Sequence, residues 1–517
     1  MRDQNSHFKK LSLGTLILML VNFSTATFAG DRENRIIDKT VKTYGGDQLI
    51  QLQSLSLTDK MIHYSQWQSG HSAQGQMITY LSEYQIELTQ DLLNKRKVFK
   101  QATTRLVGSH GSNMPTVTHR VFANGKGYSI DHALQQYHPV NSISYDNTDI
   151  GNSQLVDSLI IRQLNQDRRF SQWTDIAYIQ GEAHDVLMVN SGSDKEYTVY
   201  LNQKTGYLTR MLKNKGSQLN SYDFLEHQKT QGITWAKQLL VGTENQPVYH
   251  TNSRKIVFNS AKESQFHIPS GYQLRPKTQA VDVSQLTLRE LAKDVYFVGQ
   301  HWGYTLFIDV GEYYISAGSW QIDNKSHAWK KGLDLLRQKT GSDKPVKQHI
   351  VTHHHHDHMM GLSDVLMQGT NLVIHPADIS SVQKHLPTPL SDDRFVPISN
   401  NSNLTNSKVM LFDLPNSHAN HNLIIYLPEH KILFSEDIFG SSFKKAFHSP
   451  AGWPNGDTYF RLEVLTNKLK QLGLEVDQYV SSHHARILNQ TEIELALSVN
   501  RPSKKTLLKR LFSYHTD

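Results

Sequence analysis

One stretch of the sequence decides the fold: Thr352-His353-His354-His355-His356-Asp357-His358-Met359-Met360-Gly361. It directly follows a short run with the character of a buried strand, Gln348–Val351. Because the side chains of an extended segment alternate between two sides, we expect His353 and His355 to share one side and His354 and His356 the other. Imidazoles combined with a carboxylate are ligands that zinc prefers. The pattern His-x-His-x-Asp-His therefore indicates a metal site at the end of a strand.

A solvated histidine tract that binds metal only adventitiously is the alternative interpretation. Three later segments favour the metal site, because each places a further ligand beside a strand-like run: His418 before Asn422–Leu427, Asp437 after Ile432–Phe434, and His483 after Tyr479–Val480. Each has its own alternative. His418 can be an ordinary loop histidine, Asp437 can cap a helix, and His484 competes with His483.

The composition sets limits on the class of protein. The 517 residues exceed one ordinary core, and length alone suggests about two to four domains. Hydrophobic residues make up 38% and charged residues 20%, as in soluble globular proteins. The net charge of +7 is spread along the chain without an aromatic-interleaved basic stripe, so we expect no nucleic-acid partner. The absence of cysteine excludes disulfides, thiolate nucleophiles and cysteine metal ligands.

Residues 1–29 have the pattern of a secretory signal peptide. Three basic residues precede the apolar run Leu11–Val21, and small residues lead up to Ala29. An uncleaved membrane anchor is the alternative, but the run is shorter than the ~20 residues that a membrane span needs. We therefore expect cleavage after Ala29 and a periplasmic or secreted protein.

The rest of the chain divides into three segments. Residues 30–280 predict an antiparallel β-rich domain that follows an opening helix, Glu33–Tyr44, and ends in the polar segment Arg275–Ala280. Residues 281–500 alternate strand and helix patterns, including helices at Trp329–Gln338 and Thr458–Leu472, which predicts a layered α/β domain. Residues 501–517 form a basic tail, either a docked helix or a contact to an anionic membrane surface.

The order of the ligand-bearing segments resembles the metallo-β-lactamase superfamily over residues 288–490. The resemblance implies a four-layer αβ/βα sandwich with two divalent metal ions at the sheet edges, zinc foremost and iron or manganese as alternatives. It implies that the first ion is held by His353, His355 and His418, the second by Asp357, His358 and His483, and that Asp437 bridges them. The sequence departs from the superfamily pattern at Ser316 or Ala317, Ser417 and Ser482, and it adds the imidazoles of His421 and His484.

The implied chemistry is hydrolysis of a small-molecule substrate by a metal-bound hydroxide, which Asp357 orients as the catalytic residue. True β-lactamases of the superfamily carry Cys or Ser at the bridging position, so Asp437 argues for an ester, thioester, lactone or phosphoester. The segment Gly440–Phe460 is expected to border the pocket. The alternatives are a di-iron redox enzyme of the same fold and an envelope ligand-binding protein led by the β-rich domain.

A second resemblance concerns residues 31–280. Strand Tyr197–Leu201, the turn Lys204–Gly206 and strand Tyr207–Leu212 resemble a hairpin of lipoprotein-carrier-like β half-barrels, which usually carry Asp where this chain has Asn202. The resemblance implies a half-barrel and a possible lipid or envelope contact through this domain. A packing domain without a ligand is the other interpretation.

Overall fold

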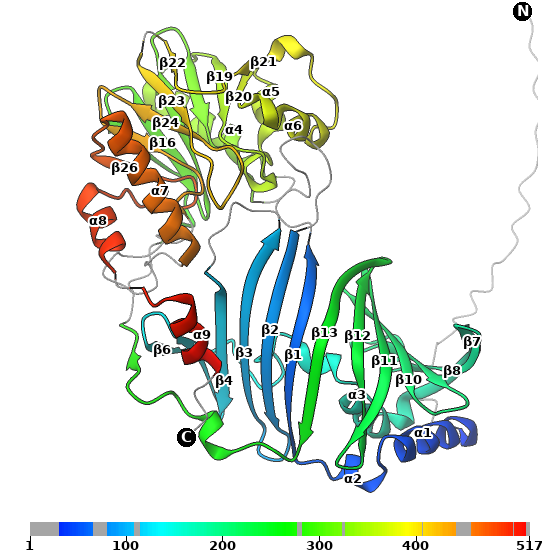
Figure 1. Cartoon of the computed structure of the whole chain (residues 1–517). Helices are drawn as coiled ribbons and strands as arrows, with labels where there is room; N and C mark the ends of the chain where they lie inside the picture. Colours follow the sequence, from blue (N-terminus) through cyan, green and yellow to red (C-terminus); the bar gives the residue numbers. More distant parts are fainter. Residues whose placement is uncertain are drawn as a thin grey trace, which may run out of the picture.

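The computed structural model describes residues 30–65, 80–107, 114–276, 282–322, 326–405, 407–440, 456–499 and 501–512. Figure 1 shows an N-terminal sheet with its helices and a C-terminal layered unit. The expected signal segment, residues 1–29, lies outside the described residues, as does most of the expected linker Arg275–Ala280. Within the described ranges, no helix is long and apolar enough to cross a membrane.

The N-terminal part is built on a sheet of fourteen strands in the order β14-β6-β5-β4-β3-β2-β1-β13-β12-β11-β10-β9-β8-β7. The strands are β1 (Ser54–Ser65), β2 (Tyr80–Asp91), β3 (Arg96–Val107), β4 (Thr116–Ala123), β5 (Lys126–Asp131), β6 (Gln136–Pro139), β7 (Ser171–Ile179), β8 (Glu182–Val189), β9 (Tyr197–Asn202), β10 (Leu208–Lys215), β11 (Gln218–Thr230), β12 (Ile233–Thr243), β13 (Gln246–Phe258) and β14 (Gln273–Leu274). Two antiparallel meanders, β1 to β6 and β7 to β13, are joined where β1 pairs with β13. The expected antiparallel β-rich region is confirmed.

The pattern of β1 explains how this sheet buries one face. Leu55, Leu57, Asp59 and Met61 alternate along the strand and are all buried, because period two places them on the same side. Asp59 is the polar exception. Its register partner on β13 is Arg254, which holds both carboxylate oxygens at 2.9 and 2.8 Å. The acidic side chain is therefore paired inside the core.

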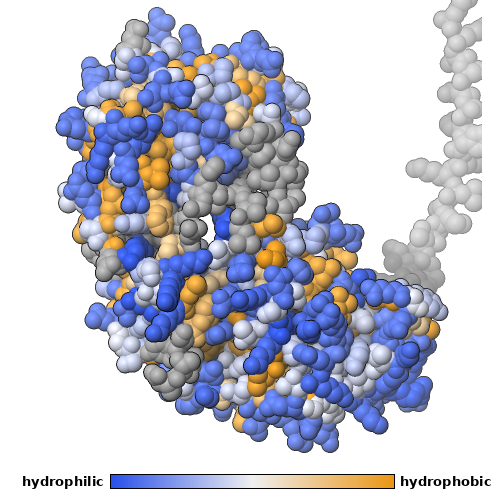
Figure 2. All heavy atoms as spheres, in the orientation of Figure 1, coloured by the Kyte–Doolittle hydropathy of each residue, from blue (hydrophilic) through white to orange (hydrophobic). Residues whose placement is uncertain are grey.

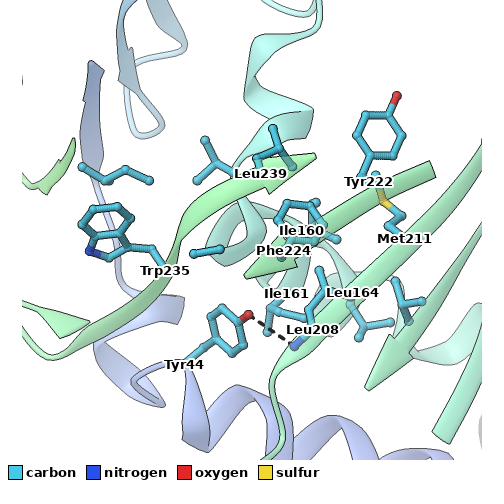
Figure 3. Packing of buried hydrophobic residues seen from close by; sticks show 14 of the residues in the cluster. Tyr44, Ile160, Ile161, Leu164, Leu208, Met211, Tyr222, Phe224, Trp235 and Leu239 are labelled. Carbon is cyan, nitrogen blue, oxygen red and sulfur yellow. Dashed lines mark hydrogen bonds between the residues drawn. The ribbon is translucent and has the colours of Figure 1, made fainter. Parts of the chain in front are cut away.

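Three helices complete the N-terminal core: α1 (Asp31–Thr43), α2 (Asp47–Ile50) and α3 (Asp157–Gln166). The opening helix is confirmed by α1, whereas α3, which links the two meanders, is absent from the sequence prediction. Ile160, Ile161 and Leu164 of α3 pack against the apolar face of β10 to β12 (Figure 3). Tyr44 lies in the same core, where its hydroxyl donates to Asp157 at 2.9 Å and accepts from the amide of Leu208 at 3.3 Å.

The C-terminal part contains two sheets. The first comprises β15 (Thr287–Ala292), β16 (Val295–Gln300), β17 (Gly303–Asp309), β18 (Tyr314–Ala317), β19 (Val346–Val351), β20 (Asn371–Ile374) and β21 (Phe395–Pro397). The second comprises β22 (Ser402–Leu404), β23 (Val409–Asp413), β24 (Leu423–Leu427), β25 (Ile432–Phe434) and β26 (Gln478–Val480). The helices are α4 (Ala328–Thr340), α5 (Leu362–Leu366), α6 (Ile379–His385), α7 (Gly456–Leu472) and α8 (Gln490–Ser498).

The apolar clusters show how these elements stack in layers. The inner faces of both sheets meet in one cluster that includes Ile350 and Val480. The outer face of the first sheet packs against α4, α5 and α6, with Trp329 fully buried. The outer face of the second sheet packs against α7 and α8, through Leu465 and Ile493 among others. The expected four-layer αβ/βα sandwich is therefore present.

One helix is shorter than the sequence predicts, and the basic tail forms the docked helix that is one of its two predicted alternatives. The run Met359–Gln368 suggests a helix, but α5 is confined to Leu362–Leu366 and is preceded by a single 3-10 turn, His356–His358. The basic tail contains a helix, α9 (Lys504–Phe512), which buries Leu507 and Leu511 and lies against β3 of the N-terminal sheet. Arg510 of α9 also donates to the carbonyl of His132 at 2.9 Å. The chain therefore returns to its N-terminal part.

The surface is mostly polar on the face seen in Figure 1. Figure 2 shows hydrophilic residues over both parts, with hydrophobic residues in small groups between them. The large apolar side chains lie mainly in the clusters described above.

The buried pair on β1 and β13 predicts a strong effect on stability. Asp59→Ala leaves the guanidinium of Arg254 buried without its charge partner, and we expect the free energy of unfolding of the N-terminal part to fall by about 3–5 kcal/mol. The matched control is Asp223→Ala on β11, whose pair with the half-exposed Arg210 contributes about 0–1 kcal/mol. Urea denaturation followed by tryptophan fluorescence measures both. Equal losses of stability from the two substitutions would contradict the strong effect predicted for the buried Asp59–Arg254 pair.

Candidate metal centre

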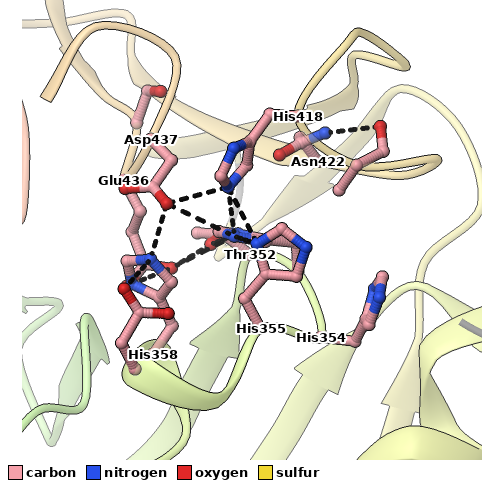
Figure 4. Close-up of polar contacts among 12 residues, drawn as sticks. Thr352, His354, His355, His358, His418, Asn422, Glu436 and Asp437 are labelled. Atoms are coloured by element: carbon pink, nitrogen blue, oxygen red, sulfur yellow. Dashed lines mark hydrogen bonds and ion pairs between the residues drawn. The ribbon is translucent and has the colours of Figure 1, made fainter. Parts of the chain in front are cut away.

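The candidate ligands lie in loops at the ends of strands from both C-terminal sheets. His353 and His355 follow β19 of the first sheet, whereas Asp437 follows β25 and His483 follows β26 of the second. His418 lies in the loop between β23 and β24, where its amide donates to Asn416 at 2.8 Å. Figure 4 shows the side chains of this edge pointing toward one another.

Three imidazoles form the first group. The distances are 3.1 Å from His353 Nε2 to His355 Nδ1, 2.9 Å from His355 Nδ1 to His418 Nε2, and 3.1 Å from His418 Nε2 to His353 Nε2. The ring centroids are 4.5, 4.4 and 4.9 Å apart. Two nitrogens bound tetrahedrally to one zinc ion at about 2.0–2.1 Å are about 3.3 Å apart. The group therefore has the dimensions that a metal ion requires.

Asp437 is shared by two groups of residues that could hold a metal ion, the first group and a second group made of Asp357, His358 and His483. Its Oδ2 lies 2.8 Å from His418 Nε2 and 3.0 Å from His358 Nε2. Its Oδ1 lies 2.5 Å from His483 Nε2. Asp357 completes the second group, with Oδ2 at 3.6 Å from His358 Nε2 and 3.7 Å from His483 Nε2. All seven residues predicted from the sequence are thus brought together in two groups that share one carboxylate.

The electrostatics of the first group suit a cation. Burial lowers the pKa of His353, His355 and His418, so that these rings are neutral and carry lone pairs. Three lone pairs that converge within about 3 Å repel one another unless a positive charge lies between them. Metal ligation needs imidazoles in this neutral form. The donor set therefore fits a divalent ion.

The second group contains a tightly coupled acid and base. Burial opposes the charged form of His358, but the carboxylates of Glu436, Asp357 and Asp437 outweigh it and raise the pKa of His358 well above its ordinary value. Burial likewise opposes ionisation of Asp437, yet the surrounding imidazoles, led by His483, hold the pKa of Asp437 well below its ordinary value. The carboxylate that both groups share is therefore ionised at neutral pH.

A further polar group nearby, His375, Asp413 and His421, has a different geometry. The rings of His375 and His421 are stacked with centroids 3.6 Å apart and planes inclined by 13°. The Nδ1 of His421 is hydrogen-bonded to Asp413 at 2.8 Å. His421, which sequence reasoning leaves outside the ligand set, thus has another partner.

Two residues at this edge are missing from the sequence prediction. Glu436 is buried, and its Oε2 lies 3.2 Å from Nδ1 of His358. The carbonyl of Trp302, in the turn between β16 and β17, lies 3.3 Å from Nδ1 of His483, and the indole borders the second group. Glu436 directly precedes the predicted ligand Asp437, and this adjacency is the feature of the sequence that could have pointed to it. For Trp302 the sequence offers none, since it lies 181 residues from His483.

The remaining predicted neighbours also have defined places. His354 is buried with Nδ1 at 3.2 Å from Asp378, whereas His356 is exposed beside His385. Ser316, which stands at a departure from the superfamily pattern, contacts His349 Nδ1 at 2.8 Å. His484 is buried near Phe439 and belongs to neither group that shares Asp437. Most of the segment Gly440–Phe460, expected to border the pocket, lies outside the described residues.

Comparisons with known proteins concern the C-terminal part. No model of a protein family matches the chain, and no curated protein matches it. Among solved structures, the metallo-beta-lactamase DIM-1 matches at 15% identity over 42% of this chain and 98% of that chain, with a TM-score of 0.33. The metallo-beta-lactamase FIM-1 from Pseudomonas aeruginosa in the mono-zinc form matches at 16% identity over 42% and 95%, with a TM-score of 0.32. The metallo-beta-lactamase from Pontibacter korlensis matches at 18% identity over 42% and 98%, with a TM-score of 0.32. The match covers the C-terminal part at low sequence identity.

Two histidines three positions apart give a test of the first group. We expect His418→Ala to lose an ion on dialysis, because only two imidazoles of the triangle remain. We expect His421→Ala to keep its full metal content, because His421 contacts Asp413 rather than the triangle. Inductively coupled plasma mass spectrometry on zinc-loaded protein measures both. Loss of an ion from His421→Ala alone would show that the wrong histidine has been assigned.

Proposed function

We propose that this chain is an exported, dinuclear, metal-dependent hydrolase. The observation that carries the proposal is the pair of His/Asp groups that share Asp437, each with one donor atom per residue within 4.8 Å of the others. In this proposal His353, His355 and His418 hold one ion, Asp357, His358 and His483 hold the other, and Asp437 bridges them. The nitrogen-rich donor set favours zinc, with iron and manganese as alternatives.

The bound ions would supply an acidified water as nucleophile and would polarise the substrate oxygen. Asp357 is the residue best placed to orient that water. Its side chain is 34% exposed, whereas those of the other six ligands are between 0 and 11% exposed. Its Oδ1 has no hydrogen-bond partner among the residues that the structure describes. This oxygen is thus available for a proton of the water, and Asp357 is the proposed catalytic residue.

The proposed substrate is a small ester, thioester, lactone or phosphoester. A bridging carboxylate, Asp437, stands where true β-lactamases of the superfamily carry Cys or Ser, and this supports the exclusion of β-lactams. Trp302 adds an aromatic wall beside His483, with centroids 5.8 Å apart, and Trp302 also packs edge-on against Trp320 at 5.8 Å. An apolar group next to the scissile bond would fit this wall.

The export and the role of residues 30–280 are parts of the same proposal. The signal-like residues 1–29 support a periplasmic or secreted location. The curved sheet supports a half-barrel, but its apolar face at β10 to β12 is packed by α3, with Ile161 and Leu164 fully buried. A lipid would have to displace this helix. We therefore assign residues 30–280 a packing role, and contact with a lipid or the envelope stays a prediction.

The proposal is tested by metal analysis together with a substrate panel of lactone, thioester, phosphodiester and β-lactam. We expect colourless protein with two zinc ions per chain, loss of turnover on chelation, and its return when zinc is added. Asp357→Ala should lower kcat by about 10²-fold or more, since the water loses its orienting carboxylate. Asp393→Ala, which removes an exposed aspartate of the same domain, should leave kcat unchanged.

Three outcomes would contradict this proposal. Full turnover by Asp357→Ala with both ions bound would remove Asp357 from the mechanism. Bound iron with a visible absorption band and no hydrolysis would favour the di-iron redox enzyme. A co-purifying lipid without turnover on any substrate would favour an envelope ligand-binding protein.

A further inference from the structure

Glu436 lies behind the metal-facing side of the site. It is 3% exposed, and the hydroxyl of Ser481 donates to its backbone carbonyl at 2.8 Å. Its side chain and that of its neighbour Asp437 contact opposite nitrogens of one ring. The Nδ1 of His358 is 3.2 Å from Glu436 Oε2, while the Nε2 of His358 is 3.0 Å from Asp437 Oδ2. Glu436 therefore lies on the far side of this imidazole from the candidate ions.

A second imidazole reaches the same oxygen through a hydroxyl. Thr352 Oγ1 donates to Glu436 Oε2, and Thr352 Oγ1 lies 3.0 Å from Nδ1 of His353. Since the hydroxyl proton is used on Glu436, the hydroxyl oxygen is left to accept from His353. The direct distance from His353 Nδ1 to Glu436 Oε2 is 3.8 Å, so Thr352 is the link. Figure 4 shows Thr352 and Glu436 among the labelled histidines, with His418 above them and His355 and His358 below.

Both contacts have the same chemical consequence. An imidazole that ligates an ion is neutral and carries one proton, and a ring that then donates from Nδ1 has its lone pair on Nε2. His353 uses Nε2 in the first group, and His358 uses Nε2 in the second. Acceptors behind ligating histidines fix the ring orientation and raise the basicity of the ligand nitrogen. One oxygen of Glu436 can therefore set one ligand of each ion.

We propose that Glu436 is a positioning residue that fixes the tautomers of His353 and His358 together and so couples the two metal sites. The inference rests on the proposed function. Loss of Glu436 affects both ions, because His358 loses its acceptor directly and the Thr352 hydroxyl, the acceptor of His353, loses the carboxylate that orients it. Loss of the Thr352 hydroxyl affects the first ion alone, because His358 contacts Glu436 directly.

The experiment measures zinc affinity by competition with a chromophoric chelator, together with the visible spectrum of the cobalt-loaded protein. We expect Glu436→Ala to weaken both Kd values by about 10- to 100-fold. Thr352→Val should weaken one Kd by a similar factor and leave the other unchanged. Thr352→Ser, which keeps the hydroxyl, should restore that Kd. The cobalt spectrum should change in Glu436→Ala and Thr352→Val, because the ligand geometry changes.

Two further variants keep the result interpretable. Glu436→Gln preserves the size of the side chain and a carbonyl acceptor, so it should fold where alanine does not, with both Kd values weakened less than in alanine. Glu429→Gln removes an exposed carboxylate from the turn between β24 and β25 and should bind zinc like the wild type. Thermal melting of the metal-free proteins checks that each variant is folded.

The outcomes separate this inference from the proposed function. A wild-type chain that binds fewer than two ions would overturn the proposed function and, with it, the coupling by Glu436. A wild type with two ions, together with unchanged affinities in both Glu436 variants, would overturn the positioning role alone. An effect of Glu436→Ala on a single ion would disprove the coupling.

Discussion

The C-terminal part depends on one buried carboxylate. Asp437 places Oδ2 within 3.0 Å of His418 and His358 and Oδ1 at 2.5 Å from His483. An acidic group that is 8% exposed is tolerated only where donors or positive charge surround it. His358 comes from the loop after the first sheet's β19, whereas His418 and His483 follow strands of the second sheet. The carboxylate is therefore satisfied only when both sheets end at the same edge.

The apolar layers enforce that alignment. Ile350 on β19 and Val480 on β26 share the inner cluster, so the strands are held with their ends together. Phe434, two residues before Glu436, is paired with Val480 in parallel register. A slip of one residue would turn every side chain of β25 to the other face and would place Phe434 outside the inner layer. Packing thus fixes Asp437 on the metal-facing side of the imidazoles and Glu436 behind them.

The sequence predicts what depends on local pattern and on the order of segments. Alternation places His353 and His355 together, and strand ends supply Asp437 and His483. It does not predict contacts between distant polar groups: Glu436 lies 84 residues from Thr352, and neither pattern nor spacing relates them. The helix α3 is missed, although its buried Ile160, Ile161 and Leu164 follow helical spacing. The helix expected over Met359–Gln368 is confined to Leu362–Leu366, and the 3-10 turn His356–His358 precedes it.

In the N-terminal sheet a buried carboxylate is also paired, but its partner is a guanidinium and not a group of imidazoles. Asp59 and Arg254 lie on β1 and β13, the strands that join the two meanders and are separated by 195 residues. Both side chains are fully buried, so any other register of these strands would leave two unpaired charges in the core. We infer that the pair selects the alignment more than it stabilises the fold, because apolar residues of similar volume pack as well. In the metal centre, the imidazoles around Asp437 favour the alignment of the two sheets in the same way. Buried charge thus fixes strand alignment in both parts.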